Sequence, residues 1–294
     1  MHSLDIKKFD PNMLLNAELI NEGIGYFDTY LLKDGQIFKK IKNREDLTSE
    51  YRYEEYDRFM SEISDKLFES MHIESEDLVL PSSVSMDDDG VCGYTVPRIS
   101  GVSLHLLLSA NGLDIISNLM LELSRKVRKL HQYGIVFPDL GNADNIMYDY
   151  ATDSLKFIDY DGLQIGKYST YDVSCLMHTN EPIFENKKYS DCTTGLYTKE
   201  FDKATLHALF LYYTTYTYLA CLNRRDGSPD KLPIHKRIDR YANMLGITGS
   251  LMHENLHTIF TTKPNDFPDE AIKRLVKDHD LDKYHSGHPV FINK

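Results

Sequence analysis

The stretch Leu130–Ile165, LHQYGIVFPDLGNADNIMYDYATDSLKFIDYDGLQI, decides the fold because it places polar side chains between short apolar runs. Asp139 lies in a loop after an amphipathic helical pattern, where a carboxylate can accept the proton of an attacking hydroxyl. Asn145 comes immediately before the apolar pair Ile146 and Met147. This position predicts an amide side chain that is fixed at the start of a buried strand.

A second polar position follows the next apolar run. Asp159 ends the predicted strand Leu155–Ile158, and Gly162 gives the backbone room to turn. Two oxygen ligands on paired strands with a base nearby outline a phosphoryl-transfer site, which holds Mg²⁺ and a nucleotide's phosphates. The alternative interpretation is that the same pattern has no catalytic role and forms only a polar loop followed by a hairpin.

The order and spacing of these residues resemble those of the protein kinase-like superfamily. The chain looks like a divergent, bacterial-type member. The family's catalytic loop matches Asp139–Asn145, and its Asp-Phe-Gly segment matches Asp159–Gly162. The spelling differs, because Phe137-Pro138-Asp139 stands where the family has His-Arg-Asp. One extra residue puts Asp144 at the family's Asn position, so Asp144 is the alternative metal ligand to Asn145. The second segment, Asp-Tyr-Asp-Gly, is also one residue longer than the family form.

The resemblance extends upstream to the parts that would hold a nucleotide. The predicted strand Gln36–Lys42 resembles the family's Val-Ala-Ile-Lys strand, which implies that Lys39 pairs with the α and β phosphates of ATP. Lys40 lies on the opposite face of a strand and is the fallback. Gly23 and Gly25 resemble a shortened glycine-rich loop that lacks the third glycine.

A helix and a hinge complete the implied nucleotide site. Apolar residues at steps of three and four predict an amphipathic helix within residues 47–71. The resemblance implies that a glutamate of this helix orients the strand lysine, and we choose Glu62 over Glu55. The strand Val91–Pro97 then leads into the inter-lobe hinge, where backbone groups from Val96 to Ile99 would bind the adenine.

The implied fold is α+β and bilobal, with a small N-terminal β-sheet lobe at residues 1–97 and a larger, mainly helical lobe at residues 98–294. The resemblance implies ATP and Mg²⁺ as cofactors, with Asn145 and Asp159 as metal ligands. It also implies Asp139, Lys39 and Glu62 as catalytic residues. Asp202, at the start of an apolar helix, either braces the catalytic-loop backbone or is an ordinary N-terminal helix charge.

The acceptor is a hydroxyl, which we expect to belong to a protein Ser or Thr. Serine and threonine kinases of the family usually carry Lys two residues after the catalytic Asp, where this chain has Gly141. Small-molecule kinases of the same superfamily also lack that lysine and are the alternative. A further alternative is a pseudokinase that binds nucleotide without transferring phosphate, because the third glycine is missing and the His-Arg-Asp segment is altered.

Composition fits one globular enzyme of 294 residues with 41% hydrophobic content. The net charge of −12 excludes a dedicated nucleic-acid binder, which needs a basic face. The four cysteines show no CxxC spacing, and neither a signal-peptide pattern nor an apolar run of membrane-spanning length occurs. We therefore expect a cytoplasmic protein with reduced thiols and no membrane partner.

One motif points to different chemistry. His253, Glu254 and His257 spell HExxH, which on a helix sets two imidazoles on one face with a glutamate beside them, as in zinc proteases. No HxxGxxH continuation follows, and Pro264 limits the helix. A zinc hydrolase is therefore the distant alternative.

Overall fold

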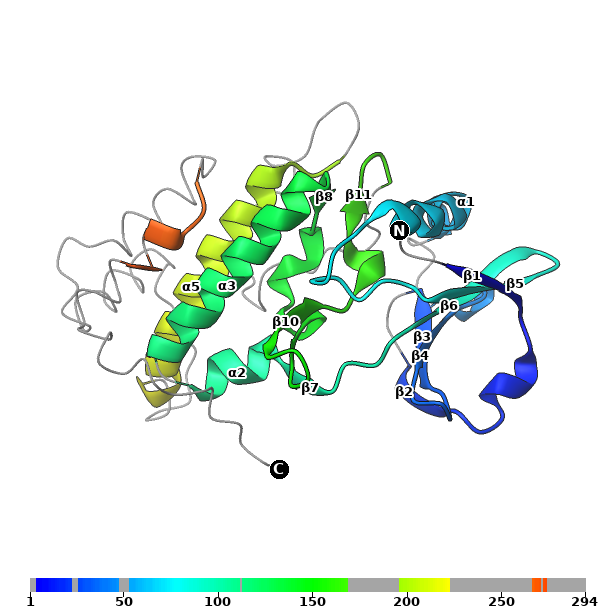
Figure 1. Cartoon of the computed structure of the whole chain (residues 1–294), viewed down its shortest axis with the longest axis horizontal. Coiled ribbons are helices and arrows are strands. Elements are labelled where there is room, and N and C mark those ends of the chain that lie inside the picture. Colours follow the sequence, from blue (N-terminus) through cyan, green and yellow to red (C-terminus); the bar gives the residue numbers. More distant parts are fainter. Residues whose placement is uncertain are drawn as a thin grey trace. The chain divides into compact units, whose positions relative to one another are not determined.

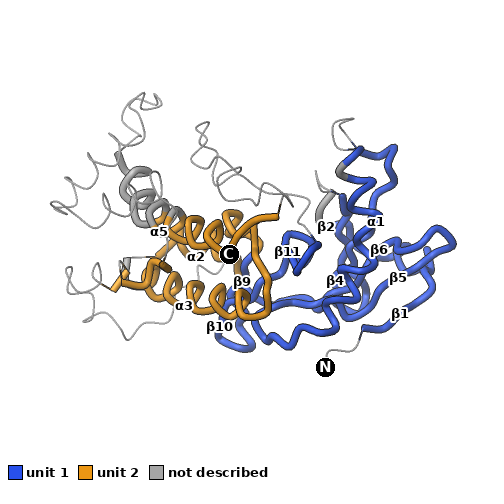
Figure 2. The backbone as a smooth tube through the Cα atoms, turned by 90° about the horizontal axis from the view of Figure 1, so that it is seen from above, with its two compact units in different colours: residues 1–101, 146–173 blue, residues 102–145, 174–294 orange. Residues whose placement is uncertain are grey.

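The computed structural model (Figure 1) describes residues 4–22, 26–47, 53–111, 113–168, 196–222, 266–270 and 272–273. Mixed α and β structure forms two compact units, coloured separately in Figure 2. The first contains residues 1–101 and 146–173, and the second contains residues 102–145 and 174–294.

A six-stranded sheet forms the base of the first unit, in the order β1-β5-β6-β4-β3-β2. The outer strand β1 is parallel to β5, and the other neighbours are antiparallel. The strands are β1 (Asp5–Lys8), β2 (Glu18–Glu22), β3 (Phe27–Leu31), β4 (Ile37–Ile41), β5 (Ser83–Asp87) and β6 (Gly90–Val96). The predicted strand at Gln36–Lys42 is therefore confirmed as β4.

Helix α1 (Tyr53–Glu69) packs on the sheet through an aromatic and aliphatic stripe. Phe59, Ile63 and Leu67 are buried, at the helical spacing that the sequence predicted. The ring of Phe59 meets Phe27 of β3 edge-on, with centroids 5.4 Å apart. This helix lies within the predicted range 47–71.

A hairpin of β9 (Ile146–Asp149) and β10 (Ser154–Phe157) belongs to the first unit. The Phe157 N–H donates to the carbonyl of Asp77, and the Phe157 carbonyl accepts from Val79 N–H, each at 2.9 Å. This backbone exchange ties the hairpin to the segment after α1. The predicted boundary at residues 97 and 98 lies close to the first division, but residues 146–173 group with the N-terminal residues instead.

The hairpin also lies against Gly101, the first residue of β7 (Gly101–Ser103). A Cβ atom at Gly101 would stand 1.9 Å from the carbonyl oxygen of Tyr148. Glycine is required here because two backbones meet without room for a side chain. In the segment after α1, Leu78 forms a single parallel bridge with Phe157.

Helices dominate the described part of the second unit. They are α2 (Leu104–Ala110), α3 (Leu113–Gln132) and α5 (Lys199–Leu222), and α3 and α5 run side by side (Figure 1). On α3, Leu119, Leu123, Val127 and Leu130 are buried, which fits the amphipathic helical pattern predicted before Asp139. His105 Nδ1 of α2 hydrogen-bonds the Tyr213 hydroxyl of α5 at 2.7 Å.

The short elements near the predicted site are β8 (Ile135–Val136), β11 (Gln164–Ile165), and 3₁₀ turns at Pro138–Gly141, Ala143–Asn145 and Tyr160–Gly162. Among the described residues, no helix combines the length and apolar character that crossing a bilayer requires.

Replacing Gly101 by Ala tests the packing of the hairpin. The new methyl group would meet the Tyr148 carbonyl, which is backbone and cannot rotate away. We expect Gly101→Ala to lower the free energy of unfolding by about 3 kcal/mol, the upper range for overpacking. Urea denaturation measures this, with Ser154→Ala on the half-buried start of β10 as the control. Equal midpoints for the two variants would contradict the close approach.

Candidate functional site

A buried ionic cluster joins β4 to the segment that follows β10. The Lys39 ammonium forms an ion pair with Asp159 and a second one, at 2.5 Å, with Asp161 Oδ1. Their side chains expose 13%, 22% and 20% of their surface, respectively. A strand lysine and the loop carboxylate predicted from the Asp-Phe-Gly resemblance are therefore in direct contact within the first unit.

The sheet supplies a second donor to the same cluster. Tyr94 on β6 is the cross-strand partner of Lys39, so both side chains point to one face of the sheet. The Tyr94 hydroxyl donates to Asp161 Oδ1 at 2.5 Å, and its ring lies edge-on to Tyr160. One carboxylate oxygen thus accepts hydrogen bonds from an ammonium and a phenol.

Helix α1 contributes a lysine to the cluster. Lys66 is fully buried, and its ammonium donates to the backbone carbonyl of Asp161 at 2.9 Å. In return, the Tyr160 hydroxyl donates to the backbone carbonyl of Lys66. These two bonds fix the turn Tyr160–Gly162 to the helix.

Burial and charge shift the pKa values in this cluster in opposite directions. Burial alone would lower the pKa of Lys39, but the attraction of Asp159 and Asp161 outweighs it and raises that pKa. Burial would raise the pKa of Asp161, but Lys39 and the Tyr94 hydrogen bond hold it below its usual value. Burial and the charge of Asp161 raise the pKa of Asp159. Burial lowers the pKa of Lys66 to about 8.

The second unit holds the predicted catalytic loop as two consecutive 3₁₀ turns. The Asn145 amide donates to the Asp139 carboxylate, and its own oxygen accepts from Asn142 Nδ2 at 3.2 Å. Asp139 is buried, whereas Asp144 is exposed. In this double turn, the side chain that contacts Asp139 is that of Asn145, and the side chain of Asp144 is exposed.

Asp202 braces this loop from α5. Its carboxylate is fully buried, accepts from the Phe137 N–H at 3.0 Å, and is 2.8 Å from His131 Nε2. The structure therefore confirms the bracing interpretation of Asp202. Burial raises the pKa of this carboxyl, an effect that His131 partly offsets.

The remaining predicted residues within the described part of the chain lie on β6, α1 and β4 or close to them. Val96 ends β6 and Ile99 follows it, so both lie in the connection that we predict to hold adenine. Glu62 lies one turn before Lys66 on α1, and its charge favours the protonated form of Lys66. The fallback Lys40 is on the other face of β4 from Lys39.

Several predictions fall outside the described residues. These are Gly23 and Gly25 of the glycine-rich loop and the HExxH residues His253, Glu254 and His257. The side chain of Glu55, the alternative to Glu62, is also outside them.

The donor set of each unit fits Mg²⁺ better than zinc. Asp159 and Asp161 offer carboxylate oxygens, and Asp139 and Asn145 offer a carboxylate and an amide oxygen, which are hard ligands. Within the described residues, no three His, Cys, Asp or Glu side chains are grouped as a metal cluster. Mg²⁺ at phosphate sites is usually held by only one or two carboxylates together with the phosphates.

Three residues of the cluster were not predicted from the sequence: Asp161, Lys66 and Tyr94. Lys66 had a detectable signal, since it falls on the stripe of α1 that holds Phe59 and Ile63, where a lysine is unexpected. Asp161 lies in the Asp159–Gly162 segment, which is one residue longer than the Asp-Phe-Gly form that it resembles. Nothing in the pattern of β6 distinguishes Tyr94 from a core tyrosine.

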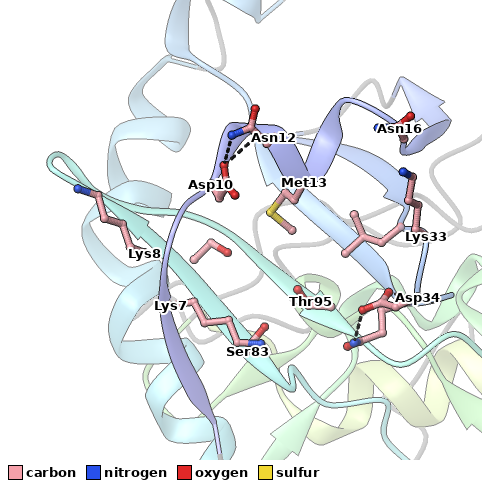
Figure 3. Close-up of a pocket in the computed structure, with 13 residues that line it drawn as sticks. Lys7, Lys8, Asp10, Asn12, Met13, Asn16, Lys33, Asp34, Ser83 and Thr95 are labelled. Atoms are coloured by element: carbon pink, nitrogen blue, oxygen red, sulfur yellow. Dashed lines mark hydrogen bonds between the residues drawn. The ribbon is translucent and has the colours of Figure 1, made fainter.

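A separate cavity of about 400 Å³ opens on the first unit (Figure 3). It lies on the sheet face opposite to Lys39 and Tyr94, because it is lined by Thr95, the next residue along β6. Its lining also includes the buried hydroxyl residues Ser83 and Ser85. This cavity is distinct from the ionic cluster.

Comparison with protein-family models and with curated proteins finds no match to this chain.

The pKa of Lys66 predicts a pH dependence of stability. Folding depresses this pKa from 10.5 to about 8, so the unfolded chain retains a proton that the folded chain releases in this window. The unfavourable contribution of Lys66 is therefore full below about pH 8 and fades as the pH rises to 10.5. From pH 7 to 9.5, wild type should gain about 2 kcal/mol relative to Lys66→Met. Urea denaturation at both pH values measures this. The exposed control Lys33→Met should show no such gain, and a constant Lys66→Met difference would contradict the burial.

Removing the Asp202 carboxylate should destabilise the second unit. Asp202→Ala leaves the Phe137 N–H and the His131 ring without their buried partner. We expect a loss of about 3 kcal/mol in the free energy of unfolding. The control Glu270→Ala, which removes the exposed ion pair with Lys273, should cost less than about 1 kcal/mol. Chemical denaturation measures the free energy of unfolding of both variants. Losses below about 1 kcal/mol in both would contradict the bracing role of Asp202.

Proposed function

We propose that this chain is an ATP-dependent phosphotransferase with a bilobal, protein kinase-like fold. It moves the γ-phosphoryl group of Mg·ATP to a hydroxyl acceptor, and we take a protein Ser or Thr as the acceptor. The observation that carries the proposal is the contact of the strand lysine, Lys39, with the loop carboxylate of Asp159. These two residue types, on a central strand and after a hairpin, are the lysine and metal ligand that a kinase requires.

In the proposed reaction, the Lys39 ammonium pairs with the α and β phosphates of ATP and gives up part of its contact with the two aspartates. The acceptor oxygen attacks the γ phosphorus, and the bond from that phosphorus to the bridging oxygen of ADP breaks. The proton of the acceptor hydroxyl goes to Asp139. Asp159 and Asn145 are the residues that would hold Mg²⁺, and the metal would supply positive charge to the phosphates.

The contact between Asn145 and Asp139 favours a second candidate function. The Asn145 amide already donates to the carboxylate that would serve as the base. That amide occupies Oδ2, one of the two oxygens that would have to accept the proton of the substrate hydroxyl. This observation supports a pseudokinase that binds nucleotide without transferring phosphate. A small-molecule kinase remains the alternative for the acceptor.

Asp159→Ala tests the proposal. We expect the variant to lose at least about 100-fold in Mg²⁺-dependent ADP release, because the proposed metal ligand is gone while Asp161 still pairs with Lys39. Phosphate incorporation into the chain and into a mixture of protein and small-molecule acceptors is measured alongside. The exposed control Asp57→Ala, which loses only a surface ion pair with Arg44, should keep wild-type turnover.

The outcomes separate the candidates. Turnover that survives in Asp159→Ala would contradict the phosphotransferase assignment. Nucleotide binding by the wild type without ADP release would favour the pseudokinase.

A further inference from the structure

We infer that Asp161 is the carboxylate that orients Lys39 toward the nucleotide phosphates, and that it acts from the loop instead of from helix α1. The kinase resemblance gives this role to a glutamate of the helix, which we predicted as Glu62. The inference rests on the proposed function and names a positioning residue for it. The extra residue in the Asp159–Gly162 segment is then the means by which this chain replaces the helix glutamate.

Two donors hold the Asp161 side chain in place. Its Oδ1 atom accepts from the Lys39 ammonium and from the Tyr94 hydroxyl, each at 2.5 Å. Lys39 and Tyr94 are cross-strand partners on the central strands β4 and β6, so the sheet itself sets their spacing. A carboxylate that bridges two fixed donors has little rotational freedom and holds the lysine in one position.

The Asp159 and Asp161 carboxylates have different contacts, which suit them to different roles. Both Asp159 and Asp161 contact Lys39, but only Asp161 is also bonded to the sheet through Tyr94. Asp159 is the predicted metal ligand, and a carboxylate that binds Mg²⁺ has less charge left to hold a lysine. Asp161 would then remain as the partner of Lys39 when metal and phosphates are bound.

Helix α1 is attached to the loop by two hydrogen bonds. The Lys66 ammonium donates to the Asp161 carbonyl, and the Tyr160 hydroxyl donates to the Lys66 carbonyl. Tyr160 and Lys66 are both fully or almost fully buried. The helix therefore contacts the loop through a cation and a carbonyl, where a kinase helix would present a carboxylate to the strand lysine.

Charge explains why a lysine suits this position of α1. Asp159 and Asp161 bring two negative charges into a buried region, and Lys39 alone would neutralise one of them. The Lys66 ammonium supplies the second positive charge. A glutamate reaching Lys39 from the helix would add a third carboxylate to the same buried region, which desolvation and repulsion oppose.

A double-mutant cycle tests the pairing without nucleotide. It compares Lys39→Met, Asp161→Asn and the double variant in urea denaturation, and repeats the cycle with Glu62→Gln in place of Asp161→Asn. We expect Lys39 and Asp161 to couple by about tenfold in the unfolding equilibrium constant, and Lys39 and Glu62 by less than about twofold. The reverse order would overturn the inference. Tyr94→Phe, which removes only the hydroxyl, gives a milder variant if Asp161→Asn does not fold.

A second measurement tests the positioning role with nucleotide. Asp161→Asn should weaken ATP binding about tenfold in calorimetry and leave adenosine binding unchanged, because only the phosphates contact Lys39. Asp161→Glu should restore part of the loss, since it keeps the charge. The control is Asp88→Asn in the exposed β5–β6 turn. Equal losses for ATP and adenosine would indicate a merely structural role and overturn the inference.

The two measurements keep the two proposals apart. A wild-type chain that binds no ATP would contradict the proposed function, while the double-mutant cycle would still decide whether Asp161 or Glu62 holds Lys39. Normal ATP binding in Asp161→Asn, with no coupling in the cycle, would reject Asp161 and leave the phosphotransferase proposal intact.

Discussion

The ion pairs of Lys39 with Asp159 and Asp161 are the constraint on which the rest of the first unit depends. A lysine on a central strand cannot be buried without carboxylates, because an unpaired charge inside a protein is strongly destabilising. Its two partners come from a turn about 120 residues later in the chain. The hairpin of β9 and β10 must therefore return to the N-terminal sheet to deliver them, and its backbone bonds to Asp77 and Val79 hold it there.

This constraint also explains why the chain divides where it does. Residues 146–173 carry the two aspartates and group with residues 1–101, although they follow the predicted catalytic loop in sequence. The loop itself stays with the helices of the second unit, where Asp202 on α5 fixes its backbone. The division falls between Asn145 and Ile146, that is, between the two predicted metal ligands.

Local sequence pattern predicted the elements that have one apolar face. The stripes of α1 and α3 and the strand at Lys39 could be read directly from spacing, because burial imposes a period on their sequence. Asp139, Asn145 and Asp159 could be chosen because each borders an apolar run. Strand β1 escaped prediction since all four of its residues are exposed and it pairs only along one edge of the sheet. The contacts of Lys66 and Tyr94 also escaped, because their partners are distant in sequence and no local period records them.

The most direct test of the central claim is a crystal structure with Mg²⁺ and a non-hydrolysable ATP analogue. We predict that Lys39 contacts the α and β phosphates while remaining bonded to Asp161, and that Asp159 coordinates the metal. It would be contradicted if Lys39 kept both aspartates and the analogue bound elsewhere, or if no analogue bound at all.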